Sequence, residues 1–219
     1  MSTFAIVGGH GQVARHLITD LVRAGHTPVA LVRREEYRAE LEQLGARVRM
    51  LDLERDDVQA FVTAFTGCDG VVFAAGGGPD GDIERKRTVD LGGSLTSIEA
   101  SRLAGIRRFV QISAIGVDNA LPDDAEPVWR AYVEAKRDAD VALRASGLDW
   151  TIVRPGALTD DAPTGAVRAG AEVDRDAITR ADVAAVVAAV LDIPTTIGAQ
   201  FEVVGGDTPI TEALASLRP

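Results

Sequence analysis

The chain has 219 residues, of which 46% are hydrophobic and 26% charged, and its formal net charge is −10 at pH 7. This length matches one domain spanning residues 1–219 and nearly excludes two full-sized domains. Because nucleic-acid binders need a basic face to neutralise phosphates, the acidic balance argues against a nucleic-acid partner.

Seven short runs rich in Val, Ile and Phe predict β-strands. In chain order they cover residues 4–7, 28–32, 47–51, 70–74, 108–112, 150–153 and 200–204. Most of these runs are continuously apolar, which is typical of strands covered by helices on both faces. Longer amphipathic stretches separate them. The sequence therefore predicts an α/β fold with a doubly wound, mainly parallel, seven-stranded sheet and helices on both faces.

Two of the predicted helices have recognisable ends. One covers residues 127–146, with proline in its first turn and Gly147 just past its end. The other follows Thr179 and Asp182, which resemble a capping box with the shorter acid. Residues 116–126 and 156–178 carry scattered Gly, Pro and Asp and are predicted to be irregular. Loops beyond the carboxyl ends of such strands hold ligands, so these two are the expected substrate-side loops.

The first predicted strand leads directly into a glycine-rich turn that opens a helix. The turn reads Gly8-Gly9-His10-Gly11-Gln12-Val13-Ala14 and fits the Gly-x-Gly-x-x-Gly/Ala spacing of dinucleotide-binding proteins. Glycine permits a sharp turn and a close approach of the backbone to a pyrophosphate, which then lies at the amino end of the helix. The alternative is a tight turn that binds nothing. We expect all residues from Gly8 to Val13 to contact the cofactor.

The end of the second predicted strand bears on the choice of dinucleotide. NAD sites usually carry an Asp or Glu here, whose carboxylate accepts a hydrogen bond from the ribose 2′-hydroxyl. This strand ends instead in Arg33 and Arg34. Guanidinium groups bind a 2′-phosphate and offer a hydroxyl no acceptor. We therefore expect NADP(H) to be preferred over NAD(H). Glu35 and Glu36 follow directly, and a shift of the loop would bring either within reach of the ribose.

Two further strand ends supply candidate cofactor contacts. Asp52, followed by Leu53, lies at the end of the third strand. There its carboxylate can accept a hydrogen bond from an adenine amino group. The equal alternative is that Asp52 caps the following helix. After the fourth strand, the small residues Ala74, Ala75 and Gly76 would let a ribose lie against the backbone. A flexible loop explains these three equally well.

Tyr132 and Lys136 lie four residues apart in the predicted helix 127–146, so they project from one face. The chain contains 21 arginines and only 2 lysines, which makes a lysine at this spacing from a tyrosine unusual. An ammonium group can lower the pKa of a neighbouring phenol and bind a ribose hydroxyl. Ser113, at the end of the fifth strand, carries a hydroxyl that can orient a substrate carbonyl, although strand-end serines often only close loops.

These motifs, together with Ser146-Gly147-Leu148-Asp149-Trp150-Thr151-Ile152-Val153-Arg154-Pro155-Gly156, resemble the short-chain dehydrogenase/reductase superfamily. The compact atypical branch that includes flavin and biliverdin reductases is the most similar. The resemblance implies a Rossmann fold, a nicotinamide cofactor, a catalytic set of Ser113, Tyr132 and Lys136, and Pro155 near the nicotinamide. The family often has asparagine where this chain has Asp90. That departure puts a four-residue proton relay in question.

The resulting hypothesis is an NADPH-dependent oxidoreductase that reduces a small carbonyl or quinone-like substrate. The alternative is a redox sensor that binds NADP(H) without turnover. His10, His16 and His26 have no metal-ligand arrangement, so no metal is expected. No run approaches the ~20 apolar residues of a membrane span, and the start lacks a signal-peptide pattern. The single cysteine, Cys68, excludes an internal disulfide, and a cytoplasmic location is expected. A homodimer is compatible with the sequence.

Overall fold

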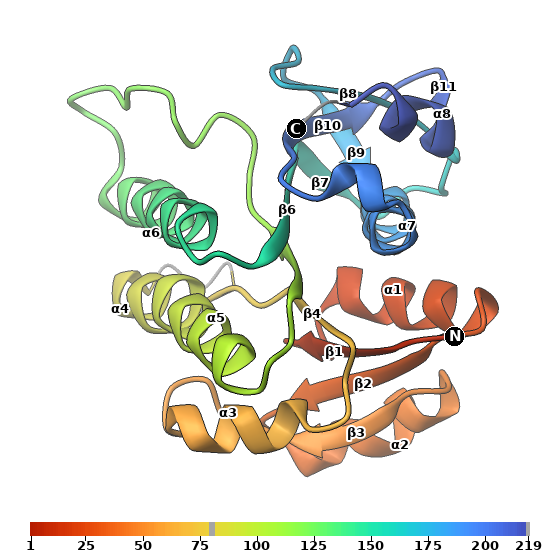
Figure 1. Cartoon of the computed structure of the whole chain (residues 1–219). Helices are drawn as coiled ribbons and strands as arrows, with labels where there is room; N and C mark the ends of the chain where they lie inside the picture. The colour runs from red at the N-terminus through yellow and green to blue at the C-terminus, as the bar shows by residue number, and fades with distance from the viewer. Residues whose placement is uncertain (79–81, 218–219) are drawn as a thin grey trace.

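The structure, a computed structural model, describes residues 1–78 and 82–217. Its centre is a nine-stranded sheet with the strand order β11-β8-β10-β6-β5-β4-β1-β2-β3 (Figure 1). Seven of these strands are parallel and match the predicted seven, with ends shifted by at most two residues. They are β1 (Thr3–Val7), β2 (Thr27–Val32), β3 (Arg47–Met50), β4 (Gly70–Phe73), β5 (Arg108–Ile112), β6 (Asp149–Pro155) and β10 (Gln200–Gly205).

The continuous apolar pattern of these strands follows from burial on both faces. In β1, Phe4 and Ile6 belong to one hydrophobic cluster, whereas Ala5 and Val7 belong to the cluster on the opposite side of the sheet. All four are buried. Because successive side chains of a strand point to opposite faces, a sheet covered on both sides needs an apolar residue at every position.

Helices cover both faces of the sheet, as the sequence predicts (Figure 1). The cluster on one face includes residues of α1 (Gln12–Arg23), α2 (Arg38–Gln43), α7 (Arg180–Asp192) and α8 (Ile210–Ala215). The cluster on the other face includes residues of α3 (Val58–Phe65), α5 (Gly93–Leu103) and α6 (Pro127–Arg144). Before α5 come the short α4 (Ile83–Arg85) and a π-helical segment, η2 (Lys86–Gly92). Short 3₁₀ turns are η1 (Glu35–Tyr37) and η3 (Pro194–Thr196).

The prediction that residues 156–178 are irregular is wrong. They contain β7 (Ala157–Thr159), β8 (Ala166–Gly170) and the start of β9 (Ala177–Thr179). β8 pairs antiparallel with β10 and with β11 (Thr208–Pro209) at the sheet edge, and β7 pairs with β9. These strands are short, and within β8 only Val167 is buried, so no continuous apolar run marks them. Residues 116–126 contain no helix or strand, as expected.

The capping box expected before α7 is half formed. The Thr179 hydroxyl accepts a hydrogen bond from the Asp182 backbone N–H at 2.9 Å, which caps the helix. The Asp182 carboxylate instead accepts from the backbone N–H groups of Thr164 and Gly165, at 3.0 and 2.9 Å. Asp182 thus ties the chain entering β8 to the start of α7.

The sheet topology brings the predicted site residues to one edge. Strands β1 to β6 are parallel, so their carboxyl ends lie on the same side of the sheet. The chain order reverses between β1 and β4, which creates the crevice where open α/β sheets bind ligands. Segments far apart in the sequence, from the glycine-rich turn to Pro155, therefore meet at this crevice.

Candidate functional site

The glycine-rich turn depends on glycine at its first two positions. Gly8 has φ of +80°, and a Cβ there would lie 2.7 Å from the Ala75 Cα. A Cβ on Gly9 would lie 2.7 Å from the Ala30 Cβ. Gly11 is the N-cap of α1, and no side chain caps this helix end. The first N–H groups of α1 are thus available to an anion, and the turn fits a pyrophosphate.

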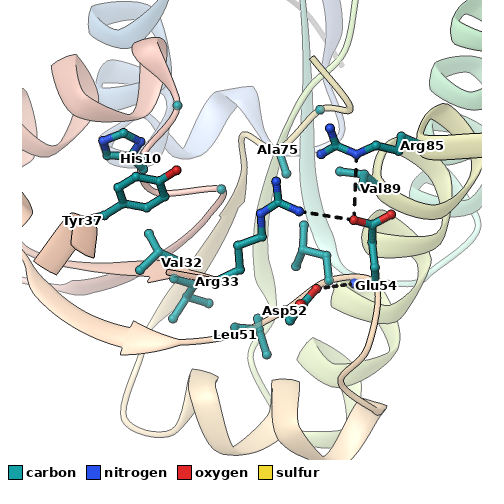
Figure 2. A pocket seen from close by; sticks show the side chains of 15 residues that line it. His10, Val32, Arg33, Tyr37, Leu51, Asp52, Glu54, Ala75, Arg85 and Val89 are labelled. Carbon is teal, nitrogen blue, oxygen red and sulfur yellow. Dashed lines mark hydrogen bonds and ion pairs between the residues drawn. The ribbon is translucent and has the colours of Figure 1, made fainter. Parts of the chain in front are cut away.

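A cavity of about 290 Å³ lies beside this turn (Figure 2). Gly8, His10 and Gly11 from the turn line this cavity. The His10 ring stacks on the Tyr37 ring, with centroids 3.6 Å apart and an interplanar angle of 3°. Tyr37 was not among the predicted site residues, because its contact with His10 is made only in the folded chain. Together the two rings form one wall of the cavity.

Arg33 lines the opposite part of this cavity and faces a carboxylate. Its Nη1 lies 3.5 Å from Glu54 Oε2, which is also 3.8 Å from Arg85 Nε. The Thr88 hydroxyl donates to Glu54 Oε1 at 2.9 Å. Figure 2 shows Glu54 between the two guanidinium groups. The expected positive charge at the end of β2 is therefore present, and Glu54 partly balances it.

Arg34 lines neither this cavity nor the larger one beside Tyr132. Its Nη1 pairs with Glu36 at 3.2 Å, and its Cζ lies 5.9 Å from the centre of the Tyr37 ring. The structure therefore brings only one arginine of the predicted pair into the cavity. Gly9 and Gln12, which were also predicted to contact the cofactor, line neither of these cavities.

Asp52 and Leu53 both line the cavity at the end of β3. Asp52 Oδ1 accepts a hydrogen bond from the Glu54 backbone N–H at 3.0 Å. The alternative that Asp52 caps the following helix is wrong. The N-cap of α3 is Asp57, whose side chain accepts from a backbone N–H in the first turn. Asp52 instead closes the turn between β3 and α3.

A second cavity, of about 660 Å³, shares Ala75 and Gly76 with the first. It unites side chains from three separate elements: Ser113 follows β5, Tyr132 and Lys136 come from α6, and Pro155 ends β6. Val13 and Ala74 line it too. The ends of both predicted substrate-side loops reach it through Glu126, Gly156 and Leu158. The residues predicted to be catalytic thus face one cavity that continues into the first.

Lys136 is held by the buried carboxylate of Asp90, and this ion pair was not predicted. Lys136 Nζ lies 3.4 Å from Asp90 Oδ1 and donates to the Ile112 carbonyl at 3.2 Å. Asp90 lies in the π-helical η2, is 1% exposed, and accepts a hydrogen bond from the Gly77 N–H at 2.7 Å. π-helical turns are frequent at functional sites. Lys136 therefore has a buried counter-ion in the second cavity.

The pKa of Tyr132 is raised, and this corrects the expectation of a lowered value. Burial is the largest cause of the increase; Lys136 opposes it, while the charges of Asp90 and Asp140 add to it. Burial alone would lower the pKa of Lys136, but Asp90, Tyr132 and Asp140 together raise it above its ordinary value. At neutral pH the phenol is therefore protonated and the ammonium charged.

Ser113 belongs to a buried network around Asp140. Its hydroxyl donates to Asp140 Oδ2 at 2.8 Å. Gln111 Nε2 and Arg154 Nε donate to the same carboxylate at 2.6 and 3.0 Å. Burial raises the pKa of Asp140, and Arg154 opposes that increase. With its proton donated to Asp140, the Ser113 hydroxyl offers the cavity only its lone pairs.

Two other features of the described residues bear on function. Within residues 1–78 and 82–217, no three His, Cys, Asp or Glu side chains are grouped to hold a metal ion. No helix in the same part of the chain is long and apolar enough to cross a membrane.

The fold and the crevice define a dinucleotide-binding Rossmann protein. Residues 8–194 match the family model described as NAD(P)H-binding, so the chain belongs to this family. It is 38% identical over 213 residues to a Bacillus subtilis protein named uncharacterized sugar epimerase YhfK, covering 97% of this chain and 98% of that protein.

A solved structure from Bacillus halodurans, described as an NAD-dependent epimerase/dehydratase, superposes with a TM-score of 0.92. It is 41% identical and covers 99% of this chain and 100% of its own. The ceramide reductase of Caulobacter vibrioides is 30% identical over 154 residues, which are 70% of this chain and 45% of that enzyme. The family is thus one of NAD(P)H-binding, oxidoreductase-like proteins.

Proposed function

We propose that the protein is an NADPH-dependent reductase of the short-chain dehydrogenase/reductase type that acts on a small carbonyl or quinone-like compound. The main support is the continuity of the two cavities through Ala75 and Gly76. A dinucleotide laid along the glycine-rich turn would reach from the first cavity into the second, where Tyr132 and Lys136 lie. The reductase name of a relative supports the same reaction class.

The chain's own residues would hold the cofactor along this path. The pyrophosphate would lie against the backbone from Gly8 to Gly11 and the amino end of α1. The adenosine would occupy the cavity walled by His10 and Tyr37, and the nicotinamide end would lie near Pro155. When bound, the reduced nicotinamide supplies the hydride.

The acid–base chemistry would belong to Tyr132. Because burial raises the pKa of this phenol, it keeps its proton at neutral pH and can give it to the oxygen of a carbonyl that gains negative charge. The phenolate left behind lies beside the Lys136 ammonium, whose Nζ is 5.9 Å from the ring centre. Asp90 positions Lys136 through their ion pair. For Ser113 to bind the carbonyl, its proton must turn from Asp140 toward the substrate.

The preference for NADPH would come from Arg33. Its guanidinium lines the adenosine cavity, and a 2′-phosphate there would displace Glu54 from the arginine. Arg85, which also lines this cavity and lies near Glu54, would add a second positive charge.

Substitution of each tyrosine tests the catalytic assignment. Tyr132→Phe removes the proton donor and should lower turnover about 10²- to 10⁴-fold, with NADPH affinity nearly unchanged. The matched control is Tyr37→Phe, which lies in the adenosine cavity and keeps its ring. Turnover is followed by the loss of reduced-nicotinamide absorbance with a panel of carbonyls and quinones. Equal turnover by wild type and Tyr132→Phe would reject the assignment.

A redox-sensing role is the second candidate, and the hydrogen bond from Ser113 to Asp140 favours it. A sensor needs the cofactor cavity but no hydroxyl free to donate to substrate. It predicts tight NADPH binding without oxidation of NADPH by any member of the panel, together with a cofactor-dependent change in association with another protein. NADPH oxidation that depends on Tyr132 would exclude this candidate.

A further inference from the structure

Both lysines of the chain line the second cavity. The sequence contains Lys86 and Lys136 against 21 arginines. The two come from different elements, η2 and α6, yet both contribute to the same cavity wall. Lys86 is 5% exposed and Lys136 is 6% exposed. A chain that otherwise uses arginine has placed its two compact, strongly hydrated cations at one cavity.

The two ammonium groups differ in how their charge is balanced. Lys136 has Asp90 as its counter-ion. Lys86 donates to the Gly78 carbonyl, and within the described part of the chain no carboxylate forms an ion pair with it. A buried charge is costly unless a counter-charge and hydrogen bonds compensate it. An anion bound in the cavity would supply the counter-charge that Lys86 lacks among the described residues.

The rest of the cavity indicates what would compensate this charge. Trp129, Val128 and Leu158 give the wall of this cavity an aromatic and apolar part, and the Trp129 ring centre lies 5.5 Å from that of Tyr132. Glu126 is the other acid at the cavity, and it is exposed, so solvent screens its charge. Such a pocket suits a mostly apolar compound with one anionic group, which Lys86 would bind by a charge-assisted hydrogen bond.

We propose that Lys86 is an anion-binding residue of the second cavity, and that the substrate carries a carboxylate in addition to its reducible carbonyl. The carbonyl half of this statement rests on the proposed function, whereas the carboxylate half rests on Lys86 alone. Lys86 would then fix the orientation of the substrate while Tyr132 and Lys136 act on the carbonyl end.

The test compares acids with their methyl esters, which keep the carbonyl and remove the charge. The probes are benzoylformate, 3-benzoylpropionate and 4-carboxybenzaldehyde, because they place the carboxylate at different distances from the carbonyl. Their dissociation constants are measured by calorimetry on protein saturated with NADP⁺, where no hydride is available. At least one acid should bind wild type about tenfold or more tightly than its ester, since a charge-assisted hydrogen bond contributes about 1.5–3 kcal/mol.

Lys86→Met should abolish that advantage and leave the affinity of the ester within about twofold. Lys86→Gln serves the same purpose if the methionine variant does not fold, as judged by circular dichroism. The matched control is Arg87→Met, because Arg87 is the next residue, is exposed and does not line the cavity. It should bind every acid like wild type.

The outcomes separate this inference from the proposed function. Acids that bind in a Lys86-dependent manner without any NADPH oxidation would support the anion site and reject the reductase. Turnover of neutral carbonyls with no advantage for any acid would support the reductase and overturn the anion site. Equal weakening of acid and ester by Lys86→Met, or failure of every acid to bind, would overturn it as well.

Discussion

Replacing Arg33 with methionine should separate the binding of NADPH from that of NADH. A guanidinium bound to a phosphate contributes about 1.5–3 kcal/mol, which corresponds to about 10- to 150-fold in the dissociation constant. Because 42% of the Arg33 side chain is exposed, solvent screens this contact. We therefore expect the lower end, about tenfold weaker NADPH binding. NADH has no 2′-phosphate, so its affinity should change by less than about twofold.

The assay is a calorimetric titration of each nucleotide into wild type and variants. Arg34→Met is the matched control: Arg34 pairs with Glu36 outside the cavity, so this variant should bind both nucleotides like wild type. Glu54→Gln removes the carboxylate that would compete with the 2′-phosphate for Arg33, and should strengthen NADPH binding relative to NADH. Equal weakening of both nucleotides by Arg33→Met, or a larger effect of Arg34→Met, would refute the assignment.

Three further substitutions have defined outcomes. Asp90→Asn removes a negative charge that raises the pKa of both Tyr132 and Lys136, so the alkaline limb of the kcat/KM profile should move to lower pH; a limb that stays in place would contradict the link. Gly8→Ala places a Cβ 2.7 Å from a neighbouring backbone atom at φ of +80° and should weaken NADPH binding at least about tenfold by calorimetry, with wild-type affinity as the opposing result. Asp182→Ala removes a carboxylate that accepts two backbone N–H groups, and should lower the free energy of unfolding in urea by at least about 2 kcal/mol; a loss below about 0.5 kcal/mol would rule out this anchoring role.

The parts of the fold that were predictable are those in which the local sequence pattern and the tertiary environment require the same type of residue. Phe4 to Val7 must all be apolar because both faces of β1 are covered, and an uninterrupted run records this directly. Gly8 is needed for a local backbone reason, its positive φ, and so leaves a local signal. Tyr132 and Lys136 share a helix face by their spacing alone.

The residues that were missed have partners far away in the chain. Glu54 pairs with Arg33, which lies 21 positions earlier in the chain. Asp90 was noted only as a departure from an asparagine, and its buried ion pair with Lys136, between η2 and α6, was not predicted. No periodicity or motif records such pairs. Strand β8, next to the edge strand β11, was missed because only Val167 within it is buried. One usable signal was overlooked: the rarity of lysine that drew attention to Lys136 applies equally to Lys86.

The structure of the protein in complex with NADP⁺, solved by crystallography, tests the central claim most directly. We predict the pyrophosphate against Gly8 and Gly11 at the amino end of α1, the 2′-phosphate at Arg33, and the nicotinamide ring in the second cavity with the Tyr132 hydroxyl facing it. A nicotinamide outside that cavity, or a Tyr132 hydroxyl directed away from the ring, would contradict the proposed reductase.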